Sequence, residues 1–247
     1  VALPLKEIDD ESIKDSSITV GGHPSTFHKW WARRPLAACK AVLFASLIDD
    51  PGENLPEKEA QKERKRLFRL IEEIILWKNV DNSYVLNKAK KELKKALGNE
   101  LPTILDPFCG GGSIPLEAQR LGLPVCASDL NPVAVLITKA MIEIGQTFSN
   151  KQKINPVTLG KADVKKYVGL EGLISDIQYY AEKINSMAKK RIGKLYPKIN
   201  GEEVIAWVSA RTIKCENPAC CAEIPLVRSF LLNNKKGQTV RIEPTID

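Results

Sequence analysis

Apolar residues recur along the chain with two different spacings, that of strands and that of helices. The spacing of strands occurs in the middle of the chain. Two short apolar runs, Thr103–Leu105 and Leu123–Ser128, each end at a carboxylate. A helix is expected between them, because Ser113 and Pro115 suit a first helical turn and Gly122 suits a helix end. This order predicts a β-α-β unit of an α/β fold.

Helical spacing dominates most of the remaining chain. It predicts helices at 35–48 and 133–144, a helical hairpin over 57–97 that turns near Asn79–Ser83, and a long packed amphipathic helix over 163–196 that Pro197 ends. Near the C-terminus, short apolar runs predict strands at 204–214, 224–232 and 239–242.

The β-α-β unit contains the glycine-rich loop Asp106-Pro-Phe-Cys-Gly-Gly-Gly-Ser113. Glycine has no Cβ, so the backbone of such a loop can closely approach a ligand. A phosphate loop is excluded because no lysine accompanies Ser113, and the dinucleotide fingerprint would need glycine where Pro115 stands. A nucleoside-type ligand remains, since Asp106 can bind a cationic amine and Asp129 can accept hydrogen bonds from both ribose hydroxyls.

The loop, together with Ala127-Ser-Asp-Leu-Asn-Pro132, resembles the first two motifs of Rossmann-like S-adenosylmethionine-dependent methyltransferases that methylate exocyclic amines of bases. The alternative is a glycine-rich turn in an unrelated α/β protein. The resemblance implies S-adenosyl-L-methionine as cofactor. It also implies cofactor-binding roles for Asp106, Pro107, Phe108, Gly110, Gly112, Ser113, Asp129, Leu130 and Asn131.

A second resemblance lies upstream, in the segment from His23 to Ala38. It is similar to the opening of large prokaryotic proteins described as adenine-specific DNA methylases. In DNA amino-methyltransferases a segment like Arg34-Pro35-Leu36 closes over the methionine end of the cofactor, which implies cofactor-binding roles for Thr26, Arg34 and Pro35. The alternative is a basic helix start with Trp30 and Trp31 packed in the core.

The net charge of +7 and the pI of about 9.0 agree with a polyanionic partner. Much of the positive charge lies in the predicted hairpin. Acidic residues alternate with the basic ones there, so solvated charged faces are expected. A DNA-facing role for Lys62, Arg64, Lys65 and Arg66 is the alternative.

The cysteines do not form the pattern of a disulfide framework. Cys109 lies inside the loop and could be interpreted as a catalytic nucleophile. We reject this interpretation because an amine acceptor attacks the methyl group directly. Cys215 and Cys220 suit one knuckle of a structural zinc ribbon, but no Cys or His follows Cys221 to complete four ligands. Thiols at an ordinary turn are the alternative. No apolar run is long enough to cross a bilayer, so we expect a cytoplasmic protein without membrane contact.

DNA amino-methyltransferases hold the target amine with an Asp, Asn or Ser followed by two prolines and an aromatic residue. This sequence contains no Pro-Pro pair and too few predicted strands for a complete methyltransferase sheet. We therefore expect the cofactor-binding portion of a DNA adenine methyltransferase, a fragment whose catalytic motif belongs to the remainder of the same polypeptide and whose substrate is duplex DNA. The alternatives are a methyltransferase acting on guanine in transfer RNA, or a non-catalytic cofactor- or DNA-binding module.

The expected fold is α/β, an incomplete Rossmann-like methyltransferase sheet with a charged helical insertion and a small zinc-ribbon-like β element. Its expected parts are a cofactor-closing segment and helix (1–50), the charged helical insertion (51–100), the glycine-loop β-α-β core (101–160), the long amphipathic helix (161–200), and β strands with the cysteine knuckle (201–247).

Overall fold

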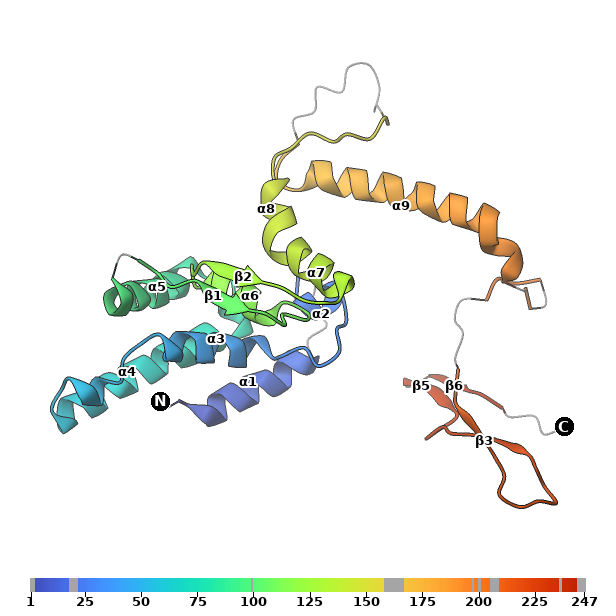
Figure 1. The fold of residues 1–247 in the computed structure, drawn as a ribbon, viewed down its shortest axis with the longest axis horizontal. Coiled ribbons are helices and arrows are strands. Elements are labelled where there is room, and N and C mark those ends of the chain that lie inside the picture. The colour runs from blue at the N-terminus through green and yellow to red at the C-terminus, as the bar shows by residue number, and fades with distance from the viewer. Residues whose placement is uncertain are drawn as a thin grey trace. The chain divides into compact units, whose positions relative to one another are not determined.

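The computed structural model describes residues 3–17, 22–98, 100–157, 167–196, 198–199, 201–204, 209–235 and 237–243. The chain forms two compact units, Val1–Tyr179 and Tyr180–Asp247 (Figure 1). The first unit contains α1 (Leu5–Ser17), α2 (Pro24–Phe27), α3 (Leu36–Ser46), η1 (Pro51–Glu53), α4 (Glu57–Ile75), η2 (Trp77–Asn79), α5 (Ser83–Leu97), β1 (Ile104–Asp106), α6 (Ser113–Arg120), β2 (Val125–Ala127), α7 (Pro132–Lys139), η3 (Ala140–Ile144) and α8 (Gly145–Thr147). The helix α9 (Glu171–Ile192) crosses the boundary between the units.

The predicted β-α-β unit is present. Strands β1 and β2 are parallel, with Ile104 opposite Val125 and Asp106 opposite Ala127, and α6 contacts both strands. Gly122 ends α6 with a positive φ of 78°, and the Leu123 amide donates to the Ala118 carbonyl at 2.9 Å, the bonding pattern of a glycine C-cap. In the part of the chain that is described, this sheet has two strands, so a complete Rossmann sheet is not seen.

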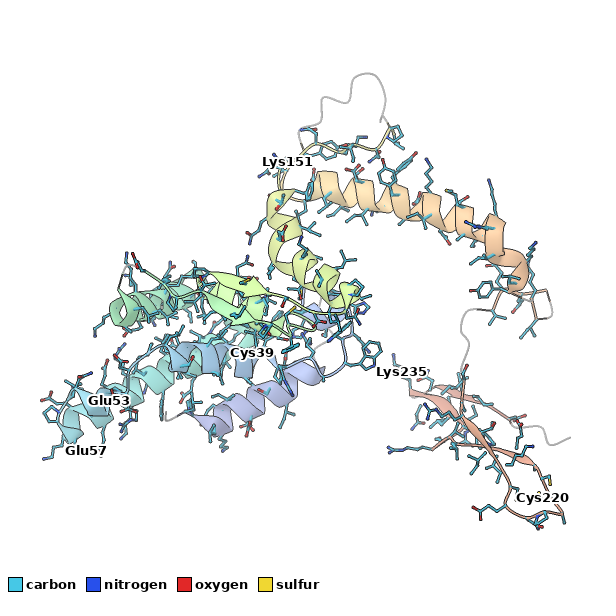
Figure 2. All side chains as sticks on the ribbon, in the orientation of Figure 1. Cys39, Glu53, Glu57, Lys151, Cys220 and Lys235 are labelled. Atoms are coloured by element: carbon cyan, nitrogen blue, oxygen red, sulfur yellow. The ribbon has the colours of Figure 1, made fainter. Side chains whose placement is uncertain are left out.

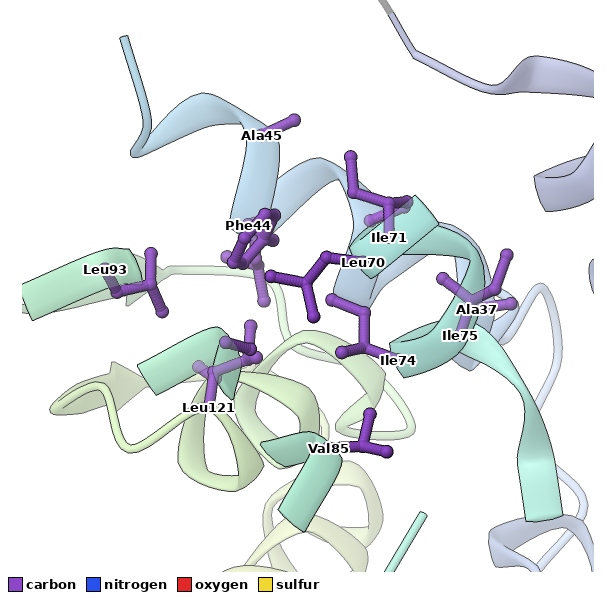
Figure 3. Packing of buried hydrophobic residues seen from close by; sticks show 14 of the residues in the cluster. Ala37, Phe44, Ala45, Leu70, Ile71, Ile74, Ile75, Val85, Leu93 and Leu121 are labelled. Atoms are coloured by element: carbon purple, nitrogen blue, oxygen red, sulfur yellow. The ribbon is translucent and has the colours of Figure 1, made fainter. Parts of the chain in front are cut away.

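The hydrophobic core lies between α3, the α4/α5 hairpin and α6 (Figure 3). Its most enclosed large side chains include Phe44 of α3, Ile74 of α4, Leu93 of α5 and Leu121 after α6, each no more than 1% exposed. Burying each such side chain contributes about 1.5–3 kcal/mol. The predicted charged hairpin is therefore present, and its apolar stripe is an integral part of the core that supports α3 and α6.

A buried ion pair joins α3 to α6 within this core. The Lys40 Nζ lies 3.0 Å from a carboxylate oxygen of Glu117, and the two side chains are 4% and 0% exposed. Lys40 also donates to the Ile74 carbonyl at 3.1 Å, and Arg120 pairs with the other oxygen of Glu117 at 2.5 Å. Because removal of Glu117 would leave the buried Lys40 without a counter-charge, this cluster couples α3, α4 and α6.

Two helices differ from their predicted form. The predicted helix 133–144 is present as α7 followed by the π-helical segment η3, and the helix continues beyond it into α8. The Gln119 side-chain amide donates to the Ile142 carbonyl at 2.8 Å inside η3. The prediction of a packed helix over 163–196 is wrong for its apolar stripe, since Ile174, Ile184 and Met187 are at least half exposed. The described part of that helix begins at Glu171, after Gly169 in a left-handed conformation, and Pro197 lies outside the described residues.

The second unit contains two antiparallel pairs, β3 (Thr212–Lys214) with β4 (Glu223–Pro225), and β5 (Leu231–Lys235) with β6 (Gln238–Arg241). The predicted strand 204–214 is described as a strand only over β3, and residues 205–208 lie outside the described residues. The single strand predicted over 224–232 is wrong, because it ends at Pro225, which lacks a backbone donor, and pairing resumes at Leu231.

No helix among the described residues combines the length and the apolar character needed to cross a membrane.

Candidate cofactor-binding site

The glycine-rich loop begins where β1 ends, and backbone hydrogen bonds tie it to the end of β2. The Ser128 amide donates to the Asp106 carbonyl, and the Cys109 amide donates to the Ser128 carbonyl, each at 2.9 Å. The buried Asp106 carboxylate accepts a hydrogen bond from the Phe108 amide at 3.3 Å through Oδ1. Its Oδ2 accepts no hydrogen bond from the described residues, so this oxygen is available to a ligand cation.

Asp129 follows β2, and its side chain is hydrogen-bonded to the glycine-rich loop. Its Oδ2 accepts from the Gly110 amide and its Oδ1 from the Asn131 amide, both at 2.8 Å. Hydrogen bonds from the Asn131 and Gly110 backbones lower the pKa of Asp129, so the group is a carboxylate at neutral pH. Each carboxylate oxygen has more than one lone pair, so a half-exposed Asp129 can accept further bonds from hydroxyl donors.

Side chains from distant segments cover the glycines. A Cβ added at Gly110 would lie 2.9 Å from Trp30 Nε1, and one at Gly111 would lie 3.0 Å from Trp30 Cβ. Gly112 has a φ of +73°, and a Cβ there would lie 2.6 Å from Thr138 Oγ1. Thr138 also donates to the Gly110 carbonyl at 3.3 Å. All three glycines are therefore tightly enclosed, and Gly110 and Gly112 also have the positive φ that favours glycine.

The segment before α3 is fastened to this loop. The Ser113 hydroxyl donates to the Arg34 carbonyl at 2.8 Å, so Ser113 contacts the N-terminal segment directly. Pro35 is the N-cap of α3, as its predicted helix-starting role requires. The buried Asp15 accepts from the Leu36 amide at 3.0 Å and bonds the buried His23 ring. Asp15 and Ser113 together fix where the Arg34-Pro35 peptide lies.

The structure brings together most of the predicted site residues. Phe108 is 84% exposed and Leu130 is 98% exposed, so both present apolar surface beside the two carboxylates. Thr26 lines an open pocket of about 450 Å³ whose wall also includes Leu116 and Met141. The Thr26 hydroxyl donates to the His23 carbonyl at 2.7 Å, which is a local role within α2.

The sequence interpretation missed Thr138 as a loop contact and had no role for Asp15. Neither carried a local signal, because each acts on a residue more than twenty positions away. The alternative that both tryptophans pack in the core is wrong for Trp31, which is 80% exposed.

The loop thiol is unsuited to nucleophilic chemistry. Burial raises the pKa of Cys109, although the Thr138 hydroxyl, which lies 3.6 Å from its Sγ, acts in the opposite direction. Cys39, buried in α3, has its pKa raised to about 12 by burial and by the nearby carboxylates of Glu117, Asp106 and Asp15. Both thiols are protonated at neutral pH, which agrees with the rejection of a covalent intermediate.

The proposed zinc knuckle does not have the donors of a closed metal site. Cys215 follows β3, and Cys220 lies at the tip of the turn that leads to β4 (Figure 2). The Cys221 thiol donates back to the Pro218 carbonyl at 3.2 Å. Within the described residues no group of three or more His, Cys, Asp or Glu side chains could hold a metal ion, so the structure does not support zinc at Cys215 and Cys220.

Two parts of the chain match models of known protein families. Residues 2–70 match a family of proteins of unknown function, DUF1156, and residues 87–192 match the D12 class N6 adenine-specific DNA methyltransferases. The second match spans β1, the glycine-rich loop and Asp129, and the first contains Arg34 and Pro35. No curated protein and no solved structure matches the chain. With these two matches, the chain resembles the N-terminal part of an adenine-specific DNA methylase.

Proposed function

We propose that the first unit binds S-adenosyl-L-methionine at the glycine-rich loop and is the donor-binding part of a DNA adenine amino-methyltransferase. The observation that carries the proposal is the position of two carboxylates, those of Asp106 and Asp129, at the ends of neighbouring strands. Asp106 ends β1 and Asp129 follows the adjacent parallel strand β2, and the Gly110 amide connects the Asp129 carboxylate to the loop that Asp106 begins.

The chemistry of these groups fits the cofactor. A buried carboxylate with one oxygen unbonded suits the cationic amine of the methionine portion, and a half-exposed carboxylate with spare lone pairs suits ribose hydroxyls. Phe108 and Leu130 offer apolar surface to an adenine ring. When bound, the cofactor supplies an electrophilic methyl group.

The residues of this chain would act by binding and positioning. The Ser113 hydroxyl and the Asp15 carboxylate fix the Arg34-Pro35 segment against the loop, which would limit where the methionine end can lie. The sequence has no Pro-Pro motif to hold an acceptor amine. We therefore assign these residues to the donor, and no residue of the chain to the acceptor.

Binding of the cofactor is testable with Asp129→Ala. We expect at least about tenfold weaker binding of labelled S-adenosylmethionine in equilibrium dialysis, because the variant has no charged acceptor for the two hydroxyls. Asp176→Ala is a matched control, since this carboxylate also accepts backbone hydrogen bonds, from Ile154 and Asn155, but lies outside the loop. Unchanged affinity in Asp129→Ala would refute the ribose assignment.

Adenine in duplex DNA is the acceptor that we propose, because the match over residues 87–192 is to adenine-specific DNA methyltransferases. Methyl transfer to duplex DNA, and not to transfer RNA, by a protein that contains this chain is the expected result. Transfer to guanine in transfer RNA would instead support the RNA methyltransferase alternative.

A further inference from the structure

The α4/α5 hairpin has two outer faces of different charge. Helix α4 carries six basic and five acidic residues, whereas α5 carries five lysines and a single glutamate, Glu92. The buried residues of α5 are Val85, Ala89 and Leu93. Lys90, Lys91, Lys94 and Lys95, which we call the lysine face, are therefore left on its solvent side, and all four are exposed.

Three acidic residues of the hairpin, one on α5 and two on α4, are already paired with cations. Arg66 bonds Glu92 at 2.8 Å and Glu63 at 2.7 Å, and Lys88 pairs with Glu73 at 3.2 Å. Hydrogen bonding from Arg66 is the main reason that the pKa of Glu63 is lowered, and the charge of Lys95 adds to it. In the described part of the chain, Lys90, Lys91 and Lys94 have no ion pair. Their charges are therefore available to a partner.

Ion pairs also weaken the hypothesis that basic residues of α4 bind DNA. Arg64 is bonded to Asp50 at 2.5 Å, and Arg66 is bonded to two glutamates, so both guanidinium groups that the sequence suggested for DNA are engaged within the protein. Lys62 and Lys65 lie on the helix that also carries Glu57, Glu59 and Glu63. The field of α4 is thus diluted, whereas that of α5 is not.

We propose that the lysine face of α5 binds the phosphate backbone of duplex DNA. This assignment rests on the proposed function, which makes duplex DNA the substrate. Lysines on successive turns of a helix are about 6 Å apart, which allows contact with successive phosphates of a strand. Ammonium groups recognise phosphate without reading bases, so the face supplies affinity and orientation but no sequence specificity. An open groove of about 390 Å³ lies between α4 and α5, and its wall includes Lys91 and Arg69 beside the ion pairs of Arg66 with Glu92 and of Lys88 with Glu73.

The test is binding of a fluorescent duplex oligonucleotide to the chain, followed by anisotropy over a range of salt concentrations. The triple variant Lys90→Gln, Lys91→Gln, Lys94→Gln should bind at least about tenfold more weakly at about 50 mM salt. The slope of log K against log salt should fall by about one for each phosphate that a lysine no longer neutralises. Lys95 is kept because its charge also acts on Glu63.

The matched control is the triple variant Lys58→Gln, Lys62→Gln, Lys65→Gln, which removes three exposed lysines of α4. Its affinity for the duplex should be within about twofold of that of the unmodified chain, because the proposal assigns no phosphate contact to these lysines. Replacing the α5 triple by arginine should restore binding. Equal decreases in affinity for the α4 and α5 variants, or an unchanged salt slope in the α5 variant, would overturn the proposal. Tighter binding of transfer RNA than of duplex DNA by the lysine face would overturn the choice of partner.

Cofactor binding separates this proposal from the proposed function. The α5 glutamine variant should bind S-adenosylmethionine as the unmodified chain does, since among the described residues no hydrogen bond or ion pair joins the lysine face to the loop. Asp129→Ala should retain the DNA affinity. A chain that binds duplex DNA through α5 but does not bind the cofactor would leave the lysine face in place and refute the donor-site assignment alone.

Discussion

Replacing Gly112 by alanine tests whether the glycine-rich loop is fixed by contact with α7. The residue has φ +73° and ψ 23°, so alanine would adopt a left-handed conformation at a cost of about 1–2 kcal/mol. The new Cβ would also lie 2.6 Å from Thr138 Oγ1 and 2.9 Å from Met141 Cε. Overpacking of this kind costs about 1–3 kcal/mol. Together these effects predict a decrease of about 2–5 kcal/mol in the free energy of unfolding.

Gly122→Ala separates the two contributions. Gly122 also has a positive φ, but its added Cβ would meet only the flexible Lys90 side chain, at 3.3 Å and beyond. The expected decrease is therefore the backbone cost alone, about 1–2 kcal/mol. Thr138→Ala should partly rescue Gly112→Ala by removing the closest clashing atom, so the effects of the two substitutions should be less than additive in the double variant.

Urea unfolding followed by tryptophan fluorescence measures these differences, because Trp30, Trp31 and Trp77 all belong to the first unit. Gly112→Ala should shift the midpoint further than Gly122→Ala does. Equal shifts, or strict additivity with Thr138→Ala, would refute the close packing of α7 against the loop.

The remaining predictions concern buried groups. Lys40→Met should lower the free energy of unfolding by about 3–5 kcal/mol in the same urea experiment, because Glu117 would lose a cation at 3.0 Å in the core. Glu117→Gln should be comparably destabilising. A decrease below about 1 kcal/mol would contradict the coupling of the helices through this cluster. Because burial raises the pKa of Cys39 to about 12, the folded state keeps this proton above the ordinary thiol range, so stability should decline as pH rises from about 9 toward 12. Cys39 should also be alkylated far more slowly than the exposed Cys126 at pH 8, as peptide mass spectrometry would reveal; equal rates would contradict its burial.

Local signals in the sequence predicted the elements around the site. Pro35 begins α3, and Gly122 ends α6 in the left-handed conformation that its position demands. The β-α-β unit and the helical hairpin were also predictable, because apolar spacing and turn residues act over a few positions. The predictions that proved wrong concern features that depend on packing against other segments of the chain. The apolar stripe of α9 has helical spacing but is largely exposed, and one predicted strand is divided after Pro225.

The sequence by itself determined which residues make up the candidate site, since the glycine-rich loop and the two carboxylates at the ends of apolar runs are local patterns. Only the tertiary structure decided what holds that site in place. The contacts of Thr138 with Gly110, of Ser113 with Arg34 and of Asp15 with Leu36 join residues far apart in the chain. The structure also decided which basic residues are neutralised, because Arg66 pairs with Glu92 across the hairpin. Such pairings depend on how helices pack, and helix periodicity carries no information about the partner that a side chain will meet.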